Sequence, residues 1–181
     1  MRAIFLLVTA PPLLFAAPAF AQNASLSSSQ PLSQSGKQFL AFASQVNIGE
    51  IRAGLLAEQK AQSNAVKAFG RLMTLDHSEL ESQLDATAAI DHTQIPDEPS
   101  SSTEQQADQL KSMSGAQFDR AYMNDMVQGH EKAVGKFESE KSNAQNPTVR
   151  DVVSSALPIL QQHLALAKAV QASLSGATAS K

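Results

Sequence analysis

Three histidines and one glutamate stand at positions where the apolar pattern of this chain calls for a core residue. Each lies near the middle of a different predicted amphipathic helix: Glu50, His77, His130 and His163,. Burying one carboxylate and three imidazoles without partners would cost several kcal/mol in total, because each group loses its hydration. Helical bundles build metal sites in their cores from inward-facing side chains of this kind. We therefore interpret the four residues as candidate ligands of one metal ion.

The composition of this candidate site restricts the metal. Three imidazoles and one carboxylate favour Zn, Cu, Fe or Ni and disfavour Ca and Mg, which prefer oxygen ligands. Such a set can hold one ion tetrahedrally, or leave a position open if Glu50 moves away. A ferritin-type di-iron centre requires a Glu-x-x-His on each of two helices. Three residues before the histidines, however, the chain has Thr74, Val127 and Leu160. The pattern therefore favours a single ion.

Four helices must bring these residues to one height. Apolar residues spaced by three and four predict helices over residues 36–62, 64–90, 115–142 and 147–173,. At a rise of 1.5 Å per residue, each candidate ligand lies within about 4.5 Å of the middle of its helix. Residues at the middle share one layer whichever way the chain threads. A polar network in the same layer, with Glu50 paired to His77, is the alternative that needs no metal.

Capping patterns predict where the first and third of these helices begin. Ser35 with Gln38, and Ser114 with Gln117, form capping boxes in which each side chain satisfies a backbone N–H of the first turn,. We expect the first helix to start at Ser35. The words SGKQF and SGAQF that begin at these serines also indicate two related helical hairpins.

Prolines predict the remaining breaks. The segment 91–113 contains Pro96, Pro99 and a run of serines, so we expect a long connection with a short helix around residues 104–111,. His92 belongs to this connection and should be solvated. Asn146 before proline predicts the start of the last helix. Pro158 lies inside that helix and should kink it without ending it, because the apolar stripe continues on both sides,.

Other side chains near the candidate ligands have simpler interpretations. Asp76 and Glu131 adjoin histidines in the sequence but point about 100° away around the helix,. We expect these two carboxylates to accept hydrogen bonds from ligands or to lie at the surface. The methionines of the apolar stripes are interpreted as core packing rather than as thioether ligands: Met73, Met123 and Met126,.

Residues 1–21 have the pattern of a secretory signal peptide. Arg2 precedes two apolar runs, and Ala19-Phe20-Ala21 is a small-x-small cleavage pattern,. Prolines interrupt the segment, which falls short of the roughly 20 apolar residues of a membrane span. We expect cleavage after Ala21 and a periplasmic or secreted protein with no transmembrane segment in the mature chain. The lack of cysteine excludes a disulfide framework,.

The rest of the chain is predicted to be one domain without a nucleic-acid partner. Residues 22–34 are rich in Ser and Gln and predict a flexible lead-in, the helical domain spans 35–173, and 174–181 should be a flexible tail,. The chain carries 14 Lys and Arg against 17 Asp and Glu, and these charges are scattered. It therefore lacks the basic patch typical of nucleic-acid binding. No protein partner can be predicted.

Three sequence words carry a resemblance to a known family. They are GEIRAGLLAEQKAQSNAVKAFGRLMTLDHSEL, FDRAYMNDMVQGHEKAVGKFESE and ALPILQQHLALAKAV. Together they resemble the family called domain of unknown function 4142, exported bacterial proteins often labelled as outer-membrane or periplasmic, over about residues 36–172. The resemblance implies an all-α, ferritin-like antiparallel four-helix bundle with a long connection between helices 2 and 3. It also implies that Glu50, His77, His130 and His163 occupy the family's Glu and His positions. The residue before His130 is usually acidic in the family, and Gly129 departs from this pattern.

Three functions compete at this point. The first is a metal-binding or metal-buffering module that holds one Zn, Cu or Fe ion. The second is a ferritin-like oxidoreductase, which the shortage of carboxylates disfavours, so an enzyme is the less favoured interpretation and no catalytic residue is predicted. The third is a metal-free envelope stress or protein-interaction module. Family membership would supply the fold and the compartment without an activity.

Overall fold

The part of the chain that this computed structural model describes, residues 31–179, is helical. Its elements are α1 (Gln34–Lys60), α2 (Asn64–Ile90), α3 (Ser101–Lys111), α4 (Gly115–Asn143) and α5 (Pro147–Ala179), and these residues contain no strand. The predicted signal segment 1–21 and most of the predicted lead-in lie outside the described residues, as do residues 180–181. The predicted helices are therefore present, including the short one between α2 and α4.

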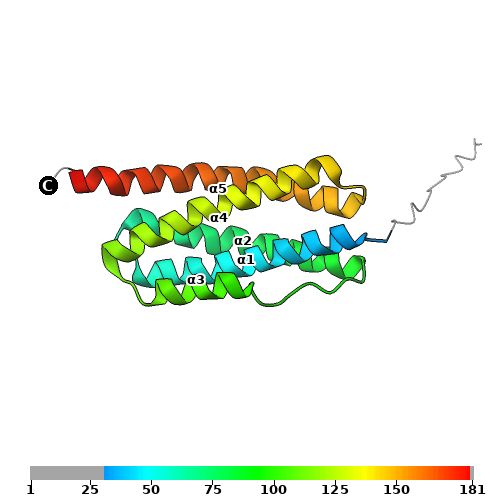
Figure 1. Ribbon diagram of the computed structural model, residues 1–181, viewed down its shortest axis with the longest axis horizontal. Helices are drawn as coiled ribbons and strands as arrows, with labels where there is room; N and C mark the ends of the chain where they lie inside the picture. Colours follow the sequence, from blue (N-terminus) through cyan, green and yellow to red (C-terminus); the bar gives the residue numbers. More distant parts are fainter. Residues whose placement is uncertain (1–30, 180–181) are drawn as a thin grey trace, which may run out of the picture.

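The four long helices lie side by side as two hairpins (Figure 1). The helices α1 and α2 pack along each other, as do α4 and α5, while α1 also contacts α4 and α2 contacts α5. The helices α2 and α4 run in the same direction, and α3 lies along the outside against α1 and α4 (Figure 1). Each long helix thus presents its buried face to two neighbours.

The core consists of two apolar clusters with polar residues between them. One cluster contains residues from the start of α1 and the end of α4, such as Phe39 and Phe137. The other contains residues from the opposite ends, such as Ala57 and Phe118. The buried polar side chains that fall between these segments in sequence are Ser44, Asn47, Glu50, His77, His130 and His163. The histidines therefore share a central layer, as the helix midpoints predicted.

The first helix begins slightly earlier than predicted. Its N-cap is Ser33, whose hydroxyl accepts a hydrogen bond from the Gly36 amide at 3.1 Å. The hydroxyl of Ser35 instead lies 2.9 Å from that of Ser33. The capping box predicted at Ser35 is therefore wrong, because a serine two residues earlier occupies the cap. Ser114 is the N-cap of α4, although its side chain makes no capping hydrogen bond.

A buried carboxylate that local patterns did not predict holds the turn between α1 and α2. Asp119, on α4, is 3 % exposed. Its two oxygens accept hydrogen bonds from the backbone amides of Gln62 and Ser63, both at 2.9 Å. The two amides lie 57 and 56 residues away in the sequence. Asp119 thus satisfies donors that the start of α2 leaves exposed and ties the two hairpins together.

The last helix is continuous through Pro158, as predicted. It starts at Pro147 after Asn146, whose side-chain oxygen accepts a hydrogen bond from the Val149 amide at 3.3 Å. The helix continues to Ala179, beyond the end predicted at residue 173. Leu174 is partly buried against the second apolar cluster, which extends the packed face of α5 into the segment predicted to be a flexible tail.

Glycines allow the close approach of α1 to two neighbours. A Cβ atom on Gly54 would lie 2.5 Å from the carbonyl oxygen of Gly70 on α2. A Cβ atom on Gly49 would lie 2.6 Å from the Thr103 methyl group on α3. At Gly54 the neighbour is backbone, so the close approach of α1 and α2 requires glycine, whereas a larger residue at Gly49 would force the Thr103 side chain to shift. The same stretch of α1 carries Asn47 and Glu50, so these contacts also position the polar layer.

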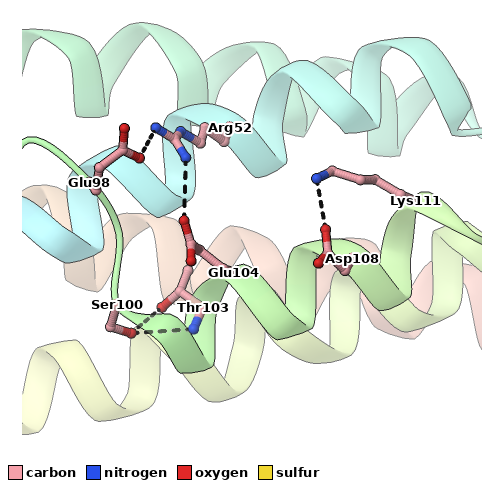
Figure 2. Close-up of polar contacts among 7 residues, drawn as sticks. All are labelled: Arg52, Glu98, Ser100, Thr103, Glu104, Asp108 and Lys111. Atoms are coloured by element: carbon pink, nitrogen blue, oxygen red, sulfur yellow. Dashed lines mark hydrogen bonds and ion pairs between the residues drawn. The ribbon is translucent and has the colours of Figure 1, made fainter.

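Ion pairs at the surface hold the segment around α3 against α1 (Figure 2). Arg52 pairs with Glu98, which precedes α3, and lies 4.0 Å from Glu104 within it. The hydroxyl of Ser100 caps α3 by accepting a hydrogen bond from the Thr103 amide at 3.3 Å.

None of the described helices is both long enough and apolar enough to span a membrane.

Candidate metal centre

Three histidines from three helices meet in the central layer. His77 on α2, His130 on α4 and His163 on α5 are each at most 1 % exposed. Their ring centroids are 5.3 to 5.8 Å apart. One nitrogen of each ring lies within 4.8 Å of the corresponding nitrogens of the other two. The structure thus brings together all three predicted histidines, whereas the fourth histidine of the chain, His92, is exposed in the α2–α3 connection.

An asparagine orients the ring of His77. The Nδ1 atom of His77 lies 2.9 Å from Oδ1 of Asn47 on α1. The amide nitrogen of Asn47 donates to Glu81 at 3.0 Å, and a carboxylate can only accept, so the oxygen of Asn47 faces the ring,. His77 must therefore donate from Nδ1, which leaves the lone pair on Nε2 unprotonated.

The other two rings are held by equivalent acceptors. The Nδ1 atom of His130 lies 2.9 Å from the carbonyl oxygen of Met126, one turn earlier on α4. The Nε2 atom of His163 lies 2.8 Å from a carboxylate oxygen of Asp76 on α2. A carbonyl or carboxylate oxygen can only accept, so each of these ring nitrogens carries the proton. The opposite nitrogen of each ring then bears a lone pair.

The nitrogens with lone pairs are also the ones without partners. Among the described residues, His77 Nε2, His130 Nε2 and His163 Nδ1 are buried and have no hydrogen-bond partner. Metal-binding histidines characteristically donate their other N–H to a carboxylate or carbonyl, which fixes the tautomer and the direction of the ring. All three rings show this arrangement at once. The cluster is therefore chemically suited to hold one cation through three neutral imidazoles.

Glu50 lies beside the histidine cluster and is not one of the three converging groups. Its Oε1 atom is 3.9 Å from Nδ1 of His130, the nitrogen on the opposite side of the ring from Nε2. Its Oε2 atom is buried and has no partner. The alternative pairing of Glu50 with His77 is not observed, because Asn47 occupies that partner position. Direct ligation by Glu50 would require its side chain to swing past the ring of His130.

Burial shifts the pKa values of His77, His163 and Glu50 toward the neutral forms. It lowers the pKa of His77 well below the ordinary value of 6.5, and repulsion from His130 and His163 lowers it further. Burial also lowers the pKa of His163, against the opposing effect of its hydrogen bond to Asp76. For Glu50, burial raises the pKa above 4.5, although the neighbouring His130 opposes this change. Neutral imidazoles are the form that binds a metal, so the lowered pKa values of His77 and His163 reduce the competition from protons,.

These pKa shifts predict that the metal-free protein loses stability in mild acid. Below about pH 6.5 His77 and His163 bind protons in the unfolded chain more readily than in the folded protein, where they are buried. The free energy of unfolding should therefore fall as the pH drops. For His77 alone the slope should be about 1 kcal/mol per pH unit. Glu50 has the opposite sign, since its raised pKa favours the folded state only at acidic pH. Urea unfolding in chelator at pH 7.5 and 5.5 tests this. Equal stability at both values would contradict it.

Two acidic residues beside the histidines have different roles. Asp76 accepts a hydrogen bond as predicted, but from His163 on α5 and not from the adjacent His77. Glu131 pairs with Lys168 at 2.7 Å on the surface. The three methionines interpreted as core packing are at most 5 % exposed and belong to the second apolar cluster.

Sequence reasoning missed Asn47, which lies in the polar layer, and Tyr122, which belongs to the second apolar cluster. Asn47 lies four residues after Ala43 and three before Glu50, so its spacing places it on the same buried face, and this signal could have identified it,. Tyr122 has a buried hydroxyl without a partner among the described residues. Burial raises its pKa well above 10.0, and the charge of Glu50 adds to this effect. Its phenol is therefore neutral.

Fold and site together define an all-helical protein with three convergent histidines in its core. The family model named domain of unknown function (DUF4142) matches residues 21–170. The chain belongs to this family, as the three sequence words indicated. A search of curated proteins finds no match.

A solved structure shares this fold. It is the crystal structure of a DUF305 fragment from Deinococcus radiodurans, which superposes with a TM-score of 0.70. The similarity covers 79 % of this chain and 99 % of that chain at 14 % sequence identity. At this identity the likeness concerns the fold alone.

Proposed function

We propose that this protein binds one transition-metal ion through His77, His130 and His163. The observation that carries the proposal is the set of three buried ring nitrogens without partners, each on a ring whose other nitrogen is held by an acceptor. Three imidazoles suit Zn, Cu or Fe better than Ca or Mg. Glu50 is the carboxylate that could complete a fourth position, after rotation of its side chain,.

The proposed scaffold is a ferritin-like antiparallel four-helix bundle made of α1, α2, α4 and α5. The pairing of α1 with α2 and of α4 with α5, and the placement of α3 between the hairpins in the chain, support this assignment. Bundles of this class hold metals in their cores through side chains on facing helices. The polar layer between two apolar clusters is the equivalent position here.

The proposed location is the periplasm or the cell exterior. The support is the pattern of residues 1–21, with its apolar runs and the cleavage pattern that ends at Ala21,. A metal buffer that keeps an ion bound outside the cytoplasm fits this location. Recovery of intact Met1 in the mature protein, in place of a chain starting at Gln22, would contradict the proposal of export.

The metal content of protein purified from its native compartment tests the binding proposal. We expect about one transition-metal ion per chain, because the three histidines form a single centre. The His77→Ala variant, purified in the same way, should retain much less metal. Elemental analysis without added metal measures both. A wild-type protein without metal, or equal metal in wild type and variant, would contradict the proposal.

A further inference from the structure

A cavity next to the histidine cluster lies between α1, α3 and α4. Its volume is about 570 Å³, and its walls include Phe42 and Gly49 on α1, Thr103 on α3, and Asp125 and Gly129 on α4. Glu50 also lines it. The site described above accounts for the histidines and does not account for this space.

Glu50 stands between the cavity and the histidines. Glu50 is 8 % exposed, and its Oε1 atom lies 3.9 Å from Nδ1 of His130. Its Oε2 atom has no hydrogen-bond partner within the described part of the chain. An unpartnered oxygen this deeply buried is costly unless something binds to it at least transiently. A ligand that enters the cavity therefore meets this carboxylate, and the ring of His130 lies behind it.

A glycine on α4, Gly129, lines the cavity beside Glu50. A Cβ atom on Gly129 would lie 3.5 Å from Oε1 of Glu50, so a longer side chain there would cover the carboxylate from the cavity side. Glycine is a poor helix former compared with alanine, and Gly129 is in the interior of α4,. The position thus gives up helix stability and leaves Glu50 accessible.

Charge and the outer wall restrict what can use this space. Asp125 is a second, half-buried carboxylate in the cavity wall, whereas Lys132 is an exposed cation at its edge. Two carboxylate side chains in a partly enclosed space attract cations. The segment around α3 forms the outer wall, and Arg52 links it to α1 through Glu98 and Glu104 (Figure 2).

We propose that this cavity is the route by which a divalent transition-metal ion reaches the three-histidine centre, with Asp125 and Glu50 as successive transit ligands. The inference rests on the proposed function. Passage past Glu50 brings the ion to His130, the ring of the histidine cluster that lies 3.9 Å from Oε1 of Glu50. A barrier on such a route changes association and dissociation by the same factor, since the bound and free states are unaffected.

Metal-binding kinetics of matched variants test the route. The probe is Co²⁺, whose visible absorption changes when it binds imidazole nitrogen, mixed with metal-free full-length protein in a stopped-flow instrument. Gly129→Leu should slow association and dissociation by about tenfold each, because entry then requires a rearrangement, and should leave the equilibrium affinity unchanged. The control is Gly135→Leu on the same helix, because a Cβ atom at Gly135 meets nothing within 4 Å.

A second pair of variants guards against misfolding of Gly129→Leu. Asp125→Asn should lower the association rate by roughly three- to tenfold at low salt, with a smaller effect at high salt. Glu131→Gln removes the same charge from α4 outside the cavity and should leave the rate near that of the wild type. Rates unchanged in both Asp125→Asn and a folded Gly129→Leu would overturn the route but leave metal binding intact. A wild-type protein that binds neither Co²⁺ nor Zn²⁺ would overturn the proposed function together with the route.

Discussion

Replacing His77 with alanine is expected to abolish the stabilisation that zinc gives the folded protein. A ligand that binds only the folded state at 1,000 times its Kd raises the free energy of unfolding by about 4 kcal/mol. Loss of one of the three imidazoles removes a large part of that binding energy. The variant should therefore show little or no increase in the free energy of unfolding when zinc is added. Urea unfolding with zinc and with chelator measures the difference for each protein.

The increment with zinc is the quantity to compare, because the substitution also changes the metal-free protein. It deletes a ring that is buried and leaves Oδ1 of Asn47 without the hydrogen bond from His77. The matched control is His92→Ala, since His92 is an exposed histidine in the α2–α3 connection, away from the three buried rings. This control should keep the full zinc increment. An equal increment in His77→Ala and the wild type would place the metal elsewhere.

Replacing Gly54 with alanine is expected to destabilise the protein, although alanine is the better helix former. The new Cβ atom would lie 2.5 Å from both the Gly70 carbonyl oxygen and the Thr74 hydroxyl. The first of these is backbone and cannot rotate away, so α1 and α2 would have to separate. Overpacking of this kind costs about 1–3 kcal/mol, against a gain of about 1 kcal/mol in helix propensity.

A matched glycine separates packing from propensity in this prediction. A Cβ atom on Gly135 of α4 meets nothing within 4 Å, so Gly135→Ala should raise the free energy of unfolding by about 0.5–1 kcal/mol,. Urea unfolding of metal-free protein at neutral pH compares the two variants with the wild type. If Gly54→Ala were as stable as Gly135→Ala, the close contact between α1 and α2 would not exist in solution.

The helices and the height of the site were predictable because both depend on local spacing. The buried face of α2 contains Val66, Phe69, Met73, His77, Leu80 and Leu84, and their spacings of three or four residues indicate a helix,. His77 is polar, but it stands at a position that the spacing assigns to the buried face. It could therefore be recognised as a buried polar group. The same reasoning identified His130 and His163.

The partners of these groups were less predictable, because they depend on rotamers and on contacts between distant segments. An apolar stripe gives the direction of a side chain only to within the width of the helix face. It cannot show that Glu50 lies on the Nδ1 side of the His130 ring. Nor can it show that Asp119 holds the turn at Gln62, because those residues are 57 positions apart. The cap predicted at Ser35 was wrong because Ser33, which has no Gln three residues later, accepts the hydrogen bond from the Gly36 amide instead.

A crystal structure of the zinc-loaded protein, with anomalous scattering measured at the zinc absorption edge, tests the metal centre most directly. The three ring nitrogens without partners predict a single strong peak about 2.0–2.1 Å from His77 Nε2, His130 Nε2 and His163 Nδ1,. The hydrogen bonds of the opposite ring nitrogens to Asn47, Met126 and Asp76 should persist. A fully loaded crystal with zinc only at surface carboxylates or His92, and none among the three rings, would contradict the proposed centre.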